Sequence, residues 1–151
     1  MTETASKPAI ALGSDHAGFE LKEELKAELL VQGHTVLDLG AFGPDSVDYP
    51  DFGHAVAKAI EDGRAEKGIV VCGTGIGISI AANRNPAVRA ALCHSGLEAR
   101  LAREHNDANV LALGARIIGS EAAKDALSAF LNTEFGGGRH EGRVAKLAAA
   151  S

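Results

Sequence analysis

A cysteine followed by three alternating glycines is the feature of this sequence with the clearest chemical meaning. Cys72 closes an apolar run and is followed by Gly73, Gly75 and Gly77. Glycines lack a Cβ, so several backbone amides can approach one small group closely. The residues that follow read as the start of a helix, whose unpaired N–H groups and partial positive charge would point toward the thiol. The sequence therefore predicts a thiolate beside a site for a developing oxyanion.

Three common interpretations of a glycine-rich loop fail on this sequence. A dinucleotide fingerprint needs glycine or alanine where Ile78 stands, and its acidic position falls around Cys93 and His94. The Walker A ending is absent, and a cysteine-phosphatase loop would need arginine at position 78. What remains is proton abstraction next to a carbonyl by the Cys72 thiolate, with loop amides holding the enediolate oxygen. The alternative is a buried structural thiol, which is our interpretation of Cys93.

Basic residues near the end of the chain leave two interpretations open. Arg139 and Arg143 share one face if their segment is helical, and His140 lies beside them. Like charges at this spacing repel by about 0.2–0.5 kcal/mol unless an anion sits between them. The group is therefore either a phosphate clamp or a solvated basic tail. His105 ends an expected helix, where the dipole favours its charged form, and is either a cap or a catalytic group.

Length, charge and cysteine content restrict the class of protein. The chain has 151 residues, 46% of them hydrophobic, which suits one domain with a real core. A net charge of −5 argues against a nucleic-acid partner, and no apolar run approaches the ~20 residues that span a bilayer. Residues 1–7 are polar, so we expect a flexible N-terminal segment without a signal peptide and a cytoplasmic protein. Two cysteines fit neither a disulfide framework nor a zinc site, and no metal is expected.

Short apolar strands alternate with amphipathic helices, which is typical of a parallel sheet covered by helices on both faces. We therefore expect an α/β fold: a single-domain Rossmann-like three-layer α/β/α sandwich with a five-stranded parallel sheet. The expected strands are 9–13, 35–39, 68–72, 89–93 and 109–113. The first two helices are expected to end near Gly33 and Gly63, the third to begin at Ile78, the fourth to cover about 95–104, and the fifth to be capped by Ser120.

Polar side chains gather where the expected strands end. Asp15 and His16 follow the first strand, Cys72 the third, His94 the fourth and Arg116 the fifth. In open parallel sheets, ligands bind outside the carboxyl ends of the strands, near the switch in strand order. The sequence therefore predicts one small-molecule site at this edge of the sheet.

Five segments resemble, in the same order, the motifs of ribose-5-phosphate isomerase type B, a family that also contains isomerases of six-carbon sugar phosphates. The segments are 13–19 (GSDHAGF), 48–51 (DYPD), 72–83 (CGTGIGISIAAN), 105–111 (HNDANVL) and 137–140 (GGRH). The resemblance covers about residues 8–147, which we take as a sugar-phosphate isomerase domain. It implies the reversible conversion of ribose 5-phosphate into ribulose 5-phosphate without a metal or organic cofactor. It also implies a homodimer with its sites at the subunit interface, and leaves pairing of dimers into a tetramer open.

The resemblance implies a role for each candidate residue. Cys72 would be the base that moves a proton between C2 and C1 through a cis-enediolate, with Thr74 assisting the substrate oxygens. His105 would open the furanose ring. The anion hole would consist of the amides of Gly73, Thr74, Gly75, Ile76 and Gly77. Substrate contacts would come from Asp15, His16, Asn106, Arg116, Arg139, His140 and Arg143, and in the family some of these groups belong to the neighbouring subunit.

Two other functions stay open at this point. Some members of the family use a glutamate in the loop, at the position that Ile78 occupies here, so the presence of Cys72 favours the cysteine mechanism. One alternative is an isomerase of another phosphorylated sugar, such as allose 6-phosphate, galactose 6-phosphate or a tetrulose phosphate. The other is a non-catalytic sugar-phosphate sensor, which would need neither Cys72 nor His105.

Overall fold

One parallel sheet and the helices packed on it make up the structure. The computed structural model describes residues 8–148, and the expected N-terminal segment 1–7 lies outside the described residues. The strands are β1 (Ala9–Ser14), β2 (Val36–Asp38), β3 (Ala65–Cys72), β4 (Ala90–Leu92) and β5 (Val110–Gly114). The helices are α1 (Phe19–Val31), α2 (Tyr49–Glu61), α3 (Ile76–Asn83), α4 (Gly96–Asn106), α5 (Ser120–Asn132) and α6 (Arg139–Ala148).

The strand order places the switch point of the sheet beside Cys72. The five strands are all parallel and run in the order β2-β1-β3-β5-β4. The chain moves outward from β1 to β2 and then returns to the other side of β1 with β3. Connections on opposite sides of the sheet therefore diverge between β1 and β3, which is where open α/β sheets bind their ligands.

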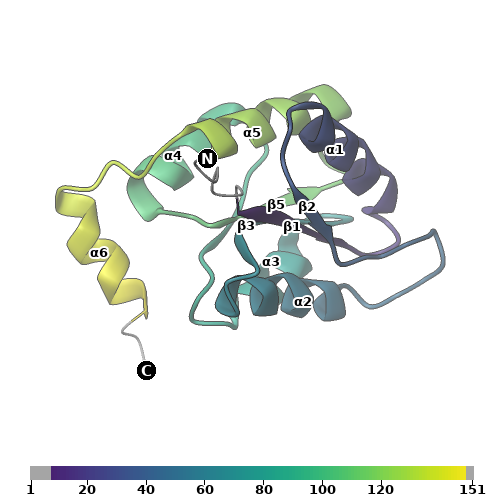
Figure 1. Cartoon of the computed structure of the whole chain (residues 1–151), viewed down its shortest axis with the longest axis horizontal. Coiled ribbons are helices and arrows are strands. Elements are labelled where there is room, and N and C mark those ends of the chain that lie inside the picture. Colours follow the sequence, from purple (N-terminus) through teal and green to yellow (C-terminus); the bar gives the residue numbers. More distant parts are fainter. Residues whose placement is uncertain (1–7, 149–151) are drawn as a thin grey trace, which may run out of the picture.

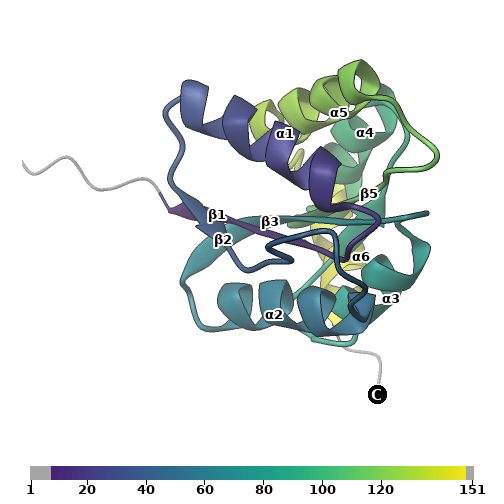
Figure 2. The same ribbon diagram turned by 90° about the vertical axis from the view of Figure 1, so that its right-hand side faces the viewer.

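Helices cover both faces of this sheet (Figure 2). Helices α1, α4 and α5 pack on one face, around Leu25, Leu111 and Phe130, all of them fully buried. Helices α2 and α3 pack on the other, around Val56, Val70 and Ile78. Strands β1, β3 and β5 lie between two apolar layers and are almost completely buried, as expected for a sheet covered on both sides. The predicted three-layer sandwich with five parallel strands is confirmed.

Three details differ from the prediction. Helix α3 begins at Ile76, two residues before the expected start, because Gly75 takes the N-cap position with a φ of 77°. The predicted cap at Ser120 is wrong: Gly119 has the extended backbone of the N-cap, and Ser120 is already the first helical residue. The edge strands β2 and β4 are only three residues long, shorter than expected, since each has a partner on one side only.

Helix α6 stands apart from the sandwich (Figure 1). None of its residues is buried, and it lies next to the end of α4. The connection 133–138 is held there by a hydrogen bond from the Gly136 amide to the Glu104 carbonyl, 3.0 Å. The segment that contains Arg139 and Arg143 is helical, so the two arginines share one face of α6, as predicted for that case. Within residues 8–148 there is no helix with the length and apolar character needed to cross a membrane.

Candidate active site

Cys72 lies at the carboxyl end of β3 with its sulfur enclosed by the glycine turn. The side chain is buried, with 4% of the residue exposed, and the Gly75 amide donates a hydrogen bond to Sγ at 3.2 Å. Helix α3 starts directly after this turn, so the positive end of its dipole faces the same place. The Cys72 sulfur therefore accepts a backbone N–H at the N-terminus of a helix.

Close packing requires glycine in this turn. A Cβ on Gly75 would lie 2.5 Å from Leu92 Cδ1 and 2.8 Å from the Leu113 carbonyl carbon, in a backbone conformation with positive φ. A Cβ on Gly77 would overlap the ring of Tyr49, the first residue of α2. The turn is therefore pressed against β4, β5 and α2. Its amides have a fixed direction, which an anion hole needs in order to act without reorganisation.

The Thr74 side chain forms a hydrogen bond within the turn. Its Oγ1 accepts a hydrogen bond from the Ile76 amide at 3.2 Å. Because a hydroxyl carries one hydrogen of its own, the Thr74 O–H remains able to donate to a bound oxygen. The structure thus brings the hydroxyl and the amides of residues 73–77 to the same turn.

Arg116 follows β5 in the chain and lies against this turn. Its amide donates to the Gly73 carbonyl at 2.9 Å, and its Nη1 is 3.3 Å from the place where a Cβ on Gly73 would stand. The side chain is exposed, so its guanidinium is available to an anion. A positive group beside the glycine turn favours anionic ligands and anionic intermediates at this position.

Asp15 and His16 approach from β1 on the other side of Cys72. Asp15 is buried, its amide donates to the Val71 carbonyl at 3.2 Å, and its Oδ1 accepts from the Gly18 amide at 3.0 Å. The Nδ1 atom of His16 accepts from the Val47 amide at 3.2 Å. Since Ser14 pairs with Val71 in the sheet, both side chains follow β1 beside the end of β3. We call Asp15, His16, residues 72–77 and Arg116 the thiol cluster.

The other predicted site residues form a second group on α4 and α6. The rings of His105 and His140 stack with centroids 4.6 Å apart and planes 18° from parallel. A cavity of about 270 Å³ beside them is lined by His105, Asn106, His140, Arg143, Val144 and Leu147. Burial, the neighbouring His105 and the charges of Arg139 and Arg143 lower the pKa of His140, which favours its neutral form. We call His105, Asn106, Arg139, His140 and Arg143 the arm cluster.

The thiol cluster and the arm cluster lie at opposite ends of the strands. Helix α4 starts after the carboxyl end of β4 and runs back to Asn106, just before β5 begins. Eleven helical residues span about 16 Å, and Gly114, at the far end of β5, pairs with Cys72. The thiol of Cys72 and the imidazole of His105 are therefore separated by about the length of β5. The structure gathers the predicted residues into two groups rather than one.

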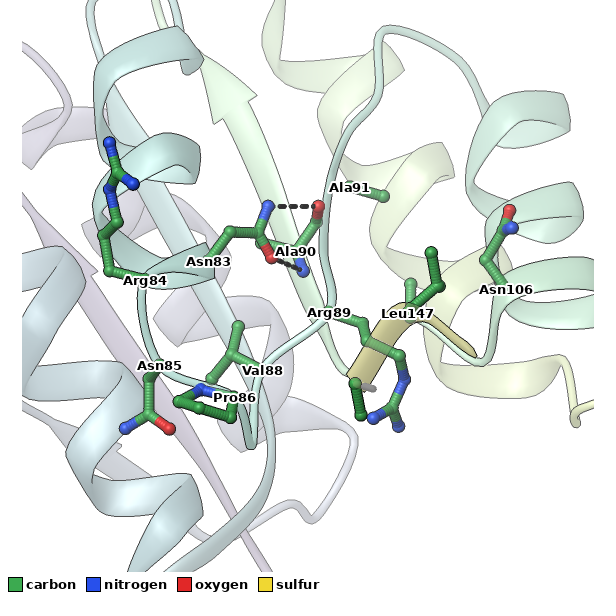
Figure 3. Close-up of a pocket in the computed structure, with 12 residues that line it drawn as sticks. Asn83, Arg84, Asn85, Pro86, Val88, Arg89, Ala90, Ala91, Asn106 and Leu147 are labelled. Atoms are coloured by element: carbon green, nitrogen blue, oxygen red, sulfur yellow. Dashed lines mark hydrogen bonds between the residues drawn. The ribbon is translucent and has the colours of Figure 1, made fainter. Parts of the chain in front are cut away.

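A larger cavity, about 580 Å³, was not predicted from the sequence (Figure 3). It lies between the end of α3, the edge strand β4 and α6, with Asn83 on one wall and Asn106 and Leu147 on the other. Two of its polar side chains have partners within the chain: Asn83 pairs with the Ala90 backbone at 2.7 and 3.0 Å, and Arg89 bonds to Asp107. The residues that line this cavity include no nucleophile or base, whereas the turn at Cys72 contains a thiol.

Among the described residues, neither the second cysteine nor the residue types that bind metals form a catalytic group. Cys93 is 2% exposed in the core, and burial together with the nearby Glu98 raises its thiol pKa to about 11. It is a packing residue, as expected. Among the described residues 8–148, no group of three or more His, Cys, Asp or Glu side chains could hold a metal ion.

Comparisons with known proteins show the family to which the chain belongs. The model of the Ribose/Galactose Isomerase family matches residues 10–147. Ribose-5-phosphate isomerase B of Escherichia coli strain K12 is 46% identical over 140 residues, which are 93% of this chain and 94% of that protein. The structure of ribose-5-phosphate isomerase B from Clostridium thermocellum superposes with a TM-score of 0.92 at 52% identity, covering 93% of this chain and 95% of that one.

A further solved relative contains a sugar phosphate. Ribose-5-phosphate isomerase B from Mycoplasma genitalium, with bound ribulose-5-phosphate, has a TM-score of 0.89 and is 39% identical, covering 93% of this chain and 94% of that one. The match with the family model spans both the thiol cluster and the arm cluster. This chain therefore belongs to the ribose/galactose isomerase family.

Proposed function

We propose that the protein interconverts ribose 5-phosphate and ribulose 5-phosphate by proton transfer through a cis-enediolate, with Cys72 as the base. The observation that carries this proposal is the 3.2 Å hydrogen bond from the Gly75 amide to the Cys72 sulfur, at the switch point of the sheet. A thiolate needs a group that stabilises its charge, and an enediolate needs donors at its oxygens. One glycine turn offers both.

The proposed reaction balances within the substrate. The Cys72 thiolate takes the proton from C2 of the open aldose, and the electron pair moves toward the carbonyl oxygen. The amides of residues 73–77 and the Thr74 hydroxyl donate to the oxygens of the resulting enediolate. The hydrogen of the C2 hydroxyl passes to the oxygen on C1, the Cys72 thiol returns its proton to C1, and C2 becomes the carbonyl carbon of the ketose. The steps need no external oxidant or reductant, so the proposal includes no organic cofactor and no metal.

The arm cluster suits the two remaining tasks, ring opening and phosphate binding. His105 is exposed and can exchange a proton with the ring oxygen or the anomeric hydroxyl of the furanose. Arg139 and Arg143 lie four residues apart on α6, where an anion between them would relieve their repulsion. Arg116 of the thiol cluster and His16 are further candidates for contacts to the substrate.

The separation of the two clusters leads us to propose a homodimer. A bound pentose phosphate cannot touch Cys72 and His105 of one chain if they lie about 16 Å apart. A second copy related by a twofold axis would bring its arm cluster to the thiol cluster of the first, and the reverse. Helix α6, which has no buried residue in the single chain, is the segment that would reach across. We further propose a cytoplasmic location, because a catalytic thiolate and a second free cysteine suit a reducing compartment.

The variant Cys72→Ala tests the proposed base. We expect turnover of ribose 5-phosphate to fall at least about 10³-fold, while binding of the substrate, measured by calorimetry, stays within a few-fold of the wild type. The Cys93→Ala variant is the matched control. Substantial isomerisation by a folded Cys72→Ala protein would refute the assignment.

A panel of four- to six-carbon sugar phosphates tests the substrate. We expect the highest kcat/KM on ribose 5-phosphate, together with exchange of the C2 hydrogen for solvent deuterium. Higher kcat/KM on allose 6-phosphate, galactose 6-phosphate or a tetrulose phosphate would select the first alternative. Tight binding without exchange or turnover on any member of the panel would select the sensor.

A further inference from the structure

The segment between β2 and α2, residues 39–48, starts from a partly buried charged group. Asp38, the last residue of β2, accepts hydrogen bonds from Lys22 Nζ at 2.8 and 2.9 Å and from Lys26 Nζ at 3.0 Å. Its Oδ1 also accepts the Gly40 amide at 3.0 Å. Lys22 is 1% exposed, so the lysine side of this contact between α1 and β2 is buried. The segment therefore leaves the sheet in a fixed direction.

The same segment is bonded to the end of β1. The Ser14 amide donates to the Gly40 carbonyl at 2.7 Å, and the Ala41 amide donates to the Ser14 carbonyl at 2.8 Å. Ser14 is completely buried and directly precedes Asp15 and His16. These two bonds fix the segment relative to the backbone that carries His16.

At its far end the segment reaches the His16 ring. The Val47 amide donates to His16 Nδ1 at 3.2 Å. A backbone amide has a hydrogen and no lone pair to offer, so Nδ1 must accept with its own lone pair. In a neutral imidazole the hydrogen then stands on Nε2, which lies on the opposite side of the ring from Nδ1.

We propose that the Val47 amide fixes His16 as the Nε2–H tautomer, so that His16 serves as a neutral hydrogen-bond donor to an oxygen of the sugar phosphate. Val47 is then a positioning residue that acts through its backbone. This inference rests on the proposed function for the identity of the ligand, but the tautomer itself does not. A donor at Nε2 cannot take a proton from carbon, so the assignment leaves Cys72 as the base of the thiol cluster.

Nitrogen NMR of the ¹⁵N-labelled wild-type protein tests the tautomer directly. At about pH 8, above the usual titration range of histidine, a protonated ring nitrogen and an unprotonated one resonate far apart. We expect His16 to show an unprotonated Nδ1 and a protonated Nε2, with the signals assigned by their loss in the His16→Gln protein. An Nδ1–H pattern, or averaged signals from two mixed tautomers, would overturn the proposal. This readout does not depend on isomerase activity, so it stays decisive even if the proposed function fails.

Replacing the donor tests its consequence for binding. Val47→Pro removes the amide hydrogen, and Val47→Ala keeps it and is the matched control. We expect the His16 signals of Val47→Pro to show mixed tautomers while those of Val47→Ala stay as in the wild type. Relative to Val47→Ala, KM for ribose 5-phosphate should rise about tenfold in Val47→Pro, with kcat within about twofold, because one ground-state hydrogen bond is weakened. A folded Val47→Pro protein that keeps both the single tautomer and the KM would contradict the role of Val47.

A pair of substitutions at position 16 tests the donor itself. Glutamine places its amide nitrogen near the position of Nε2, and asparagine places its amide near that of Nδ1. We expect His16→Gln to keep a KM within about threefold of the wild type and His16→Asn to raise it about tenfold. Equal losses in both variants would show that a donor at the Nε2 position is not what the substrate requires.

Discussion

The thiol cluster and the arm cluster are built in different ways. The turn at Cys72 follows a strand whose last five residues are buried, and its glycines are packed against β4, β5 and α2. Helix α6 of the arm cluster has no buried residue, and it meets the rest of the chain through Gly136 and the ring of His105. The core thus determines the position of Cys72, the proposed base, while α6 has a defined shape but no residue buried within the single chain.

In the proposed homodimer, one active site would combine the rigid turn at Cys72 with the exposed helix α6. Proton transfer demands a base held within a fraction of an ångström, which the packed turn provides. Phosphate binding by long arginine side chains tolerates more freedom. A second copy of the chain would supply the contacts that α6 lacks, and would join both clusters around one substrate.

Mixing two inactive variants gives the largest expected effect. Cys72→Ala and His105→Asn are each expected to be nearly inactive on ribose 5-phosphate. If each site takes Cys72 from one chain and His105 from the other, a mixed dimer contains one site with neither substitution. Equal mixing makes about half of the dimers mixed, so about a quarter of the wild-type activity should return.

The mixture needs a control in which both changes meet in one chain. The double variant Cys72→Ala/His105→Asn, mixed with wild type after the same unfolding and refolding, accounts for losses during exchange. Ultracentrifugation measures the dimer in every sample. No recovery from a mixture that contains mixed dimers would mean that Cys72 and His105 serve a site within one chain.

The His105→Asn variant separates ring opening from proton transfer. We expect kcat/KM on ribose 5-phosphate, which is mostly cyclic, to fall about 10²-fold because a general acid–base group is removed. Ribulose 5-phosphate cannot close to a furanose, so the exchange of its C1 hydrogen for deuterium should stay within a few-fold of the wild type. NMR measures this exchange directly. A similar loss in both assays would place His105 in the proton-transfer step instead.

The sequence predicted the thiol cluster well because local patterns determine it. Asp15, Cys72 and Arg116 each follow an apolar strand, and parallel strands bring their carboxyl ends to one edge. The alternating glycines marked the turn, although the positive φ of Gly75 moved the start of α3 forward by two residues. Strand periodicity therefore carried enough information to predict both the fold and the position of these residues at one end of the strands.

The arm cluster and the anchoring of His16 could not be predicted in the same way. His105 and Arg143 lie on helix surfaces, where spacing does not determine what they contact. The bond between Val47 and His16 joins residues 31 positions apart through an irregular segment, for which no periodic signal exists. The sequence does contain a signal for the ion pair of Lys22. This lysine lies three residues before Leu25 on the inward face of α1, where a lysine requires a charged partner.

Lys22→Met tests how strongly the frame of the thiol cluster depends on its buried ion pair. Removing the ammonium should lower the free energy of unfolding by about 3 kcal/mol, the lower end for breaking a buried pair, because Lys26 still reaches Asp38. Thermal unfolding should shift down by about 10 °C. Lys58→Met, which breaks an exposed pair with Asp62, is the control and should leave the midpoint unchanged.

The pKa of Asp38 determines how the stability difference between the wild type and Lys22→Met changes with pH. Burial by itself would raise the pKa of Asp38, but hydrogen bonds from Lys22, the Gly40 amide and Lys26 outweigh it and lower the pKa. A carboxyl with a lowered pKa stabilises the fold above the pKa of about 3.9 that it has when unfolded, and this contribution is lost as the pH falls through the lowered value. The advantage of the wild type over Lys22→Met should therefore be full at neutral pH and shrink in acid. An advantage that persists unchanged in strong acid would exclude the ion pair as its source.

The smallest expected effect concerns Cys93, which directly follows β4 and is not part of the thiol cluster. Burial and the nearby Glu98 raise its pKa to about 11, so at neutral pH almost none of it is thiolate, and its sulfur is enclosed in the core. Cys93→Ala should keep kcat/KM within about twofold of the wild type. Iodoacetamide at about pH 8 should modify no more than one thiol per folded chain. Mass spectrometry should find that modification at Cys72, and ribose 5-phosphate should slow it. Preferential labelling of Cys93 would mean that the glycine turn does not activate the sulfur beside it.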